Sequence, residues 1–197
     1  ITADGGKLIS KGKTNINSED KSNNPAAKNA VVAKNGAEVT LGHGTIKGNI
    51  ISDASVVTIN EDNKDGSVEG NLAVANGGTL KLSVAGLLGK LNGDIVPSSD
   101  IATVASGTST GKVDLTVANG AVWTGGLKDP SAELNLTLSG GSWMNNNTAD
   151  TTVKSLKGGN GVVKTIKYKD PSSAANVDVE IPVNGYIGMQ PYAGAVT

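Results

Sequence analysis

The sequence predicts an all-β solenoid, in which short strands stack as successive coils of one chain. A short phrase recurs five times, each time as an apolar segment, a turn with Gly, and a second apolar segment. Along the numbering, the steps between the turn glycines are 31, 41, 43 and 20. Three of the four steps lie near one or two multiples of about 20 residues, at the short end of solenoid repeats. We therefore expect each turn to lie above the turn before it. The turn glycines are Gly5, Gly36, Gly77, Gly120 and Gly140.

The composition favours a narrow core in one domain or two. Hydrophobic residues make up 37% of the 197 residues and aromatic residues only 3%, there is no Phe, and Gly occupies 27 positions. Stacked Val, Leu, Ile and Ala can fill such a core, while Asn, Ser, Thr and Gly form the turns. The sequence has no Cys, so packing and hydrogen bonds must hold the fold without disulfides. No apolar run reaches the roughly 18 residues that would predict a transmembrane helix.

The expected strands follow the phrase along the chain. The first ten residues read as strand, turn and strand, and the polar stretch 11–29 reads as a loop. Residues 70–84 return to strand, and 83–112 form one irregular coil with an insertion, because glycines weaken the helical spacing of its leucines. The other expected strands are 30–33, 37–41, 55–59, 113–117, 121–124, 133–138, 142–144, 152–156 and 162–168.

The phrase is lost after Lys167. All three tyrosines and three of the six prolines lie beyond this residue. We therefore divide the chain into a stack of coils, residues 1–167, and a C-terminal segment, residues 168–197. An uncovered coil exposes unpaired backbone groups, so we expect this segment to be an irregular cap over the open end of the stack, or the start of a following segment.

Residues 113–163 resemble the passenger domains of Gram-negative autotransporters, the proteins of type V secretion. Residues 115–125 read Leu-Thr-Val-Ala-Asn-Gly-Ala-Val-Trp-Thr-Gly, which is similar to the recurring family segment Leu-x-x-x-x-Gly-Ala-x-Trp-x-Gly. Segments 136–143, 153–156 and 161–163 then follow in the order found late in such passengers. The earlier repeats match more loosely.

This resemblance implies a right-handed parallel β-helix with three faces, a β-solenoid adhesin type. It implies a segment at the bacterial cell surface, anchored in the outer membrane by a barrel that lies outside this sequence. Adhesion, self-association or biofilm formation is then the expected function. The expected partners are host or bacterial surface components, matrix, or other passengers. Residues 168–197 do not look like the usual end of a passenger.

The charged residues argue against several function classes. All 17 basic residues are Lys, and the formal net charge is −1. Without Arg the chain lacks the bidentate donor for phosphate and guanine, so we expect no nucleic-acid binding. His43 is the only histidine and no nucleophile motif accompanies it, so we expect neither a catalytic triad nor a zinc site. We expect no enzyme activity, no cofactor, no metal centre and no membrane insertion by this segment.

The densest acidic stretch is the candidate binding segment. It superficially resembles a calcium loop, because acidic or amide side chains alternate before Gly66. Its first position is Glu rather than Asp and its twelfth is Leu72, so we favour a solvated acidic turn and leave Ca²⁺ binding open. The binding residues that we single out are Glu61, Asp62, Asp65 and Glu69.

Two residue pairs are separated by about one coil. Trp123 and Trp143 occupy equivalent places in successive copies of the phrase, which predicts an aromatic stack inside or along the solenoid, with a sugar-binding platform as the alternative. Asp114 and Glu133 are separated by almost the same interval and could stack as the carboxylate pair that a glycosidase needs. The alternatives to an adhesive module are therefore a polysaccharide-processing β-helix enzyme and a structural spacer without its own ligand.

The repeat further predicts about eight to ten coils, in a rod about 40–50 Å long at about 4.8 Å per coil.

Overall fold

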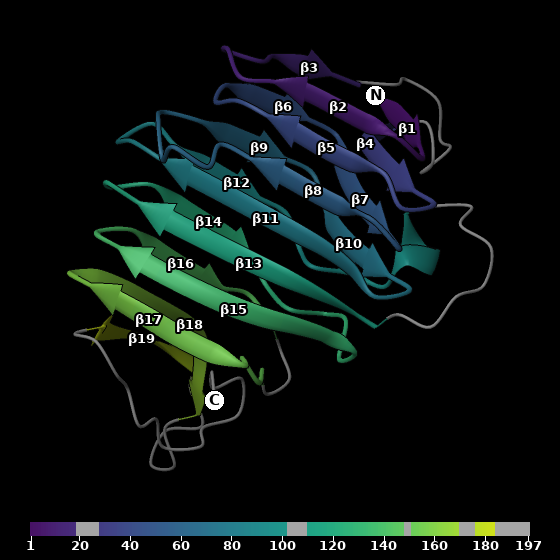
Figure 1. Cartoon of the computed structure of the whole chain (residues 1–197). Helices are drawn as coiled ribbons and strands as arrows, with labels where there is room; N and C mark the ends of the chain where they lie inside the picture. Colours follow the sequence, from purple (N-terminus) through teal and green to yellow (C-terminus); the bar gives the residue numbers. More distant parts are fainter. Residues whose placement is uncertain (19–27, 102–109, 148–150, 170–175, 184–197) are drawn as a thin grey trace.

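The structure is a computed structural model with three β-sheets, named A, B and C (Figure 1). It describes residues 1–18, 28–101, 110–147, 151–169 and 176–183, with only the backbone described for 164–169 and 176–183. The chain passes through the three sheets in turn, and we call each passage a coil. Every pairing between described strands is parallel, except the last one. This confirms the prediction of an all-β fold built from stacked parallel strands.

The strands of each sheet come from successive coils, so sheet order follows chain order. Sheet A contains β1 (Thr2–Asp4), β4 (Asn29–Lys34), β7 (Asn49–Asp53) and β10 (Leu72–Ala75). Sheet B contains β2 (Lys7–Ser10), β5 (Glu38–Leu41), β8 (Val56–Ile59), β11 (Gly78–Ala85), β13 (Gly111–Ala118), β15 (Ala132–Ser139) and β17 (Ser155–Gly159). Sheet C contains β3 (Ile16–Asn17), β6 (Thr45–Lys47), β9 (Ser67–Glu69), β12 (Lys90–Asn92), β14 (Val122–Gly125), β16 (Ser142–Asn145), β18 (Gly161–Lys169) and β19 (Asn176–Val183).

The coils vary in length and are fewer than the repeat predicted. One interior row of sheet B shows the uneven intervals, since it runs through Leu8, Val39, Val57, Leu80, Val113 and Leu134. Sheet B has seven described strands, which correspond to seven coils. They span about 29 Å from first strand to last at about 4.8 Å per step. The prediction of eight to ten coils and a rod of about 40–50 Å is therefore wrong for the described part of the chain.

The miscount arose because the recurring phrase occupies two different corners. Gly36 and Gly77 lie between sheets A and B, whereas Gly120 lies between sheets B and C. The backbone N–H of Gly77 donates to the carbonyl of Thr110 at 2.6 Å, so Thr110 takes the corresponding place one coil later. The step from Gly77 to Gly120 thus contains one long coil and one further strand, not two coils. Both corners select an Asn-Gly turn because Asn119 and Gly120, like Asn76 and Gly77, have φ between 50° and 88°.

Most expected strands are confirmed, and several short strands are added. The strands expected between residues 113 and 168 correspond to β13 to β18. The expectation missed β6 and β7, because glycines interrupt their short apolar runs. It also missed β3, which lies in the stretch 11–29 that was expected to be a loop, and β9, which lies in the acidic stretch. The irregular region 83–112 contains the end of β11, the short β12 and the 3₁₀ turn η2 (Ser98–Asp100).

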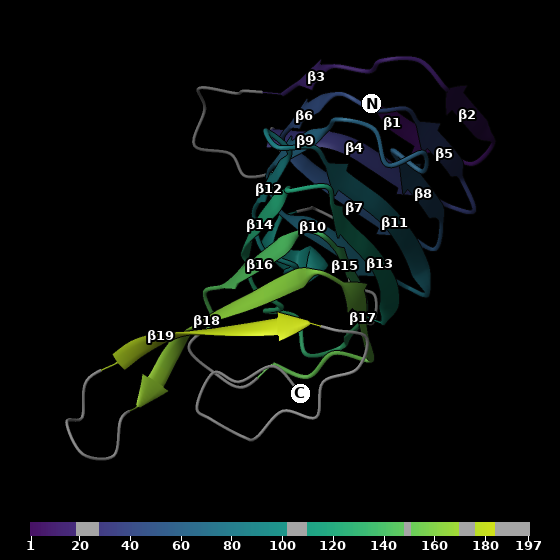
Figure 2. The same cartoon turned by 90° about the vertical axis from the view of Figure 1, so that its left-hand side faces the viewer.

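The core is a set of ladders in which each residue contacts its equivalent in the next coil. Figure 2 shows sheets B and C with the inside of the stack between them. In sheet C one interior row is Ile16, Ile46, Val68, Leu91, Trp123, Trp143 and Val163.

The two tryptophans stack inside the core, as predicted. Trp123 and Trp143 have 0% exposure, their ring centroids are 4.6 Å apart, and the ring planes differ by 4°. Each indole N–H donates to a backbone carbonyl, Trp123 to Gly93 at 2.9 Å and Trp143 to Gly125 at 3.0 Å. A sugar-binding platform needs an accessible ring face, so burial excludes that alternative.

The corner between sheets C and A is built from a glycine ladder and an amide ladder. A Cβ on Gly93 would lie 2.0 Å from the carbonyl oxygen of Gly70, so the coils approach closely only without side chains there. In each coil, the side chain of the residue after this glycine accepts a hydrogen bond from the backbone of the equivalent residue in the next coil. The oxygen of Asn49 accepts from the N–H of Asn71 at 3.0 Å, and the oxygen of Asn71 accepts from the N–H of Asp94 at 2.9 Å.

The stack ends with an antiparallel pair. β18 pairs in parallel with β16 on one side and antiparallel with β19 on the other. The expected boundary between residues 167 and 168 falls inside β18. The division into a stack and a C-terminal cap remains a prediction, and residues 184–197 lie outside the described part.

Candidate binding surface

The outer face of sheet B carries rows of polar side chains. Because side chains alternate along a strand, every second residue of β5, β8, β11, β13, β15 and β17 points outward. The parallel register then places these residues beside one another from coil to coil. The central row is Ile9, Thr40, Thr58, Lys81, Asp114, Asn135 and Ser155. A second row is Ser83, Thr116, Thr137 and Lys157.

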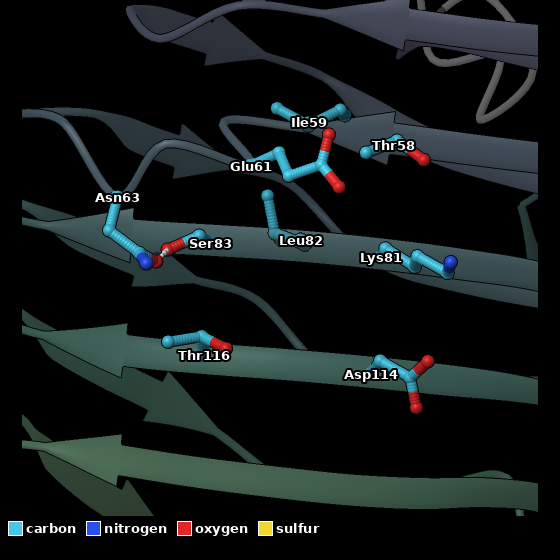
Figure 3. A pocket seen from close by; sticks show the side chains of 9 residues that line it. All are labelled: Thr58, Ile59, Glu61, Asn63, Lys81, Leu82, Ser83, Asp114 and Thr116. Carbon is cyan, nitrogen blue, oxygen red and sulfur yellow. Dashed lines mark hydrogen bonds between the residues drawn. The ribbon is translucent and has the colours of Figure 1, made fainter.

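This face is hollowed in two adjoining places, with volumes of about 210 and 300 Å³. Both hollows include Asp114 and Thr116, so they form one shallow groove across β8 to β17. Figure 3 shows Lys81 between Thr58 and Asp114 on neighbouring strands of the first hollow. The groove crosses the strands and therefore runs along the stack.

Hydrogen bonds fix the orientation of the side chains in the half of the groove that lies over β13, β15 and β17. Asp114 accepts from the side-chain amide of Asn135 at 2.9 Å, and Asn135 accepts from the hydroxyl of Ser155 at 2.9 Å. Lys112 forms an ion pair with Asp114 at 3.1 Å. These contacts hold a line of polar side chains at a spacing of about 4.8 Å, the distance between strands.

The other half of the groove, over β8 and β11, has charged groups that are available to a ligand. Lys81 is exposed and has no ion pair among the described residues. Glu61 reaches this hollow from the loop after β8, and Figure 3 shows its carboxylate between Ile59 and Leu82. At the loop end Asn63 is hydrogen-bonded to Ser83. The groove can therefore offer an ammonium group, a carboxylate, hydroxyls and amides at once.

The four acidic residues singled out from the sequence do not form one cluster. Glu61 lines the groove, whereas Asp62 and Asp65 are exposed in the loop between β8 and β9, where Asp62 lies 3.5 Å from Lys64. Glu69 lies in β9 of sheet C and forms an ion pair with Lys90 at 2.6 Å.

The surroundings of Glu69 favour its ionised form. The hydrogen bond from Lys90, with its positive charge and that of Lys47, lowers the pKa of the Glu69 carboxyl. Among the described residues no group of three His, Cys, Asp or Glu side chains could hold a metal ion. The loop is closed by Asn60, whose side-chain amide donates to the carbonyls of Lys64 and Ser83.

The histidine considered for chemistry does not line the groove. His43 is half-buried in the corner between β5 and β6, near Lys11, Glu61 and Asp62.

The suggested stacking of Asp114 on Glu133 is wrong. Asp114 pairs with Asn135 across the sheet, and Glu133 lies beside Lys112 instead. The coil at this point is therefore slightly longer than the interval from Asp114 to Glu133, and the two carboxylates are out of register.

Sequence reasoning missed the groove itself, since its members are common polar residues. Their alternation with buried leucines in 113–117 and 133–138 was the available signal. It identified one buried face but did not establish which strands were adjacent.

No protein-family model matches this chain, and no curated protein or solved structure matches it either. Among the described residues, no helix is long and apolar enough to cross a membrane.

Proposed function

We propose that this chain is a non-enzymatic, surface-displayed binding module, a segment of an autotransporter passenger that mediates adhesion or self-association. The observation that carries the proposal is the polar groove on the outer face of sheet B. An extended open groove suits many weak polar contacts in parallel, and display in many copies multiplies them by avidity. The partner is then a surface component of another cell, matrix, or another passenger.

The proposal includes a closed, right-handed β-helix with three faces. Three sheets with parallel strands from successive coils support it, as does the strong preference of parallel crossover connections for right-handedness. The resemblance of residues 113–163 to autotransporter passengers supports the location at the bacterial surface.

A binding role fits the groove better than hydrolysis does. Within the groove Asp114 is hydrogen-bonded to Asn135 and paired with Lys112, and its strand neighbours are not carboxylates. A glycosidase needs two carboxylates that flank the scissile bond at a set separation. The enzyme alternative requires turnover of a polysaccharide, and the spacer alternative requires that changes in the groove have no effect on binding.

The test displays the chain on cells that do not otherwise aggregate and compares their settling or surface binding. The groove variant combines Lys81→Gln with Asp114→Asn, which keeps the net charge. We expect it to weaken binding because it removes the exposed ammonium and the anchored carboxylate. The matched control combines Lys34→Gln with Asp4→Asn, an exposed ion pair of 2.9 Å at the ends of β4 and β1 in sheet A. Equal binding by wild type, groove variant and control would contradict the role of the groove.

The acidic turn between β8 and β9 is tested separately with Asp62→Asn and Asp65→Asn, because Glu61 lines the groove and Glu69 lies in sheet C. Exposed charges are screened beyond about 8–10 Å at physiological salt. If the acidic turn pairs with lysines of a facing chain, both this variant and added salt weaken aggregation. If aggregation resists both treatments, charge pairing by the acidic turn is excluded, and the groove is left as the proposed contact surface.

A further inference from the structure

One row of side chains on the outer face of sheet A is apolar and covered. Val32, Ile51 and Ala73 point outward in register, and Ile51 and Ala73 have 0% exposure. The cover is the segment 95–101, whose Val96 and Ile101 pack on this row. If this segment moves away, an apolar strip across three coils meets water.

The cover is fastened to the turn that follows β14. The carbonyl of Ile95 accepts two backbone hydrogen bonds, from Lys128 at 2.7 Å and from Asp129 at 3.0 Å. The N–H of Ile95 donates to the carbonyl of Gly126 at 2.9 Å. The N–H of Val96 also donates to the carbonyl of Leu72 in β10 at 2.9 Å, so the cover is held both by sheet A and by the turn 126–131.

That turn contains a buried carboxyl group without a full set of partners. Asp129 has 1% exposure, and its Oδ1 accepts from the N–H of Ser131 at 2.9 Å. Its Oδ2 is buried and has no hydrogen-bond partner in the described part of the chain. A buried ionised carboxylate with an unpaired oxygen is costly, whereas the protonated acid is much less so.

The charges around Asp129 increase this cost. Burial raises the pKa of the Asp129 carboxyl, and the backbone N–H groups of Ser131 and Ala132 partly oppose this rise. From the cover, the like charge of Asp100 in η2 adds a smaller increase. From the turn itself, the ammonium of Lys128 pairs with Asp94 of the preceding coil. The lysine that adjoins Asp129 in the chain is thus engaged by another carboxylate.

We propose that Asp129 is a protonation-dependent latch that holds the segment 95–101 over the outer face of sheet A. When Asp129 is protonated, it can stay buried and the cover is closed. When it ionises, desolvation and repulsion by Asp100 favour opening, which hydrates the carboxylate and exposes the strip of Val32, Ile51 and Ala73. Because the closed state raises the affinity of Asp129 for a proton, its stability is fully present at low pH and is lost as pH rises through the pKa of the closed state.

Hydrogen exchange of the backbone amides measures this opening directly. After correction for intrinsic rates, we expect the amides of Ile95, Lys128 and Asp129 to be less protected at neutral pH than at an acid pH at which Asp129 is protonated. In Asp129→Asn, which keeps the acceptor for Ser131, protection should be the same at both pH values. Asp114→Asn in the groove is the control and should behave as wild type. Equal protection in wild type at both pH values, or a pH dependence that persists in Asp129→Asn, would overturn the latch.

A second variant keeps the test decisive if Asp129→Asn folds poorly. Asp100→Asn retains the titrating carboxyl and removes its like-charged neighbour. We expect the midpoint of the pH dependence to move to lower pH, because Asp129 then ionises more easily. A merely structural role for the turn would leave this midpoint unchanged, and that result would contradict the coupling between the cover and Asp129.

Discussion

The first four coils and the last three solve the same packing problem in different ways. In the first four, sheet A is continuous through β1, β4, β7 and β10. In the later coils, among the described residues, no strand extends sheet A. Only two isolated β-bridges, Leu72 to Ile95 and Ile95 to Leu127, connect the coils on that side of the stack. The strands of sheet B lengthen where the two regions meet, from four residues in β5 and β8 to eight in β11, β13 and β15.

The interior changes at the same point. The sheet C ladder is aliphatic in the first four coils and continues with Trp123 and Trp143 in the next two. The indole rings are large, and their N–H groups donate to the carbonyls of Gly93 and Gly125. Larger side chains with specific hydrogen bonds can thus replace part of what a third continuous sheet provides.

The largest expected effect comes from breaking the tryptophan stack. Trp143→Ala leaves a cavity and removes one of the two hydrogen bonds that the Gly125 carbonyl accepts, and we expect a loss of about 3–5 kcal/mol in the free energy of unfolding. Ile46→Ala, at the same ladder position in the second coil, should cost less within the usual range of about 2–5 kcal/mol, because sheet A is intact there. Urea denaturation followed by circular dichroism measures both. A larger loss for Ile46→Ala would reverse the comparison.

A smaller effect is expected where the two regions meet. Gly93 belongs to the fourth coil, and a Cβ there would lie 2.0 Å from the carbonyl oxygen of Gly70 and displace the acceptor of Trp123. We expect Gly93→Ala to destabilise the fold by about 1–3 kcal/mol, as overpacking does. Gly159→Ala is the control, since nothing lies within 4 Å of its added Cβ. Equal thermal stability of the two variants would argue against close approach at this corner.

The smallest effect is electrostatic and belongs to the first four coils. Their sheet C carries Lys47, Glu69 and Lys90 on its outer side, whereas the next strand has Val122 and Thr124. The lowered pKa of Glu69 means that its contribution is present above its unfolded pKa and is lost as pH falls through the folded pKa. We expect Lys90→Gln to reduce this acid dependence of the melting temperature slightly, because exposed pairs contribute little. An unchanged pH profile would show that this pair contributes nothing measurable.

Local patterns in the sequence predicted the parts of the fold that depend on neighbouring residues. Leu134, Leu136 and Leu138 alternate with polar residues, and all three are buried in β15. The interval between Trp123 and Trp143 predicted the correct register, because no insertion separates β14 from β16.

The candidate site was predicted less well. Glu61 was singled out and lines the groove, but Lys81, Asn135 and Ser155 were not considered. Each looks like an ordinary exposed residue, and only the register from coil to coil brings them together.

The sequence by itself determined the strand type, the turn chemistry, the aliphatic core and the tryptophan stack, since these follow from side-chain alternation and Asn-Gly turns within short segments. Only the tertiary structure decided the number of coils, the corner to which each turn belongs, and the residues that share the groove. The physical reason is that parallel pairing joins residues at intervals that change from coil to coil, short from Val39 to Val57 and long from Leu80 to Val113. Loops of variable length change that interval at a small entropic cost, and so they leave almost no mark on local sequence.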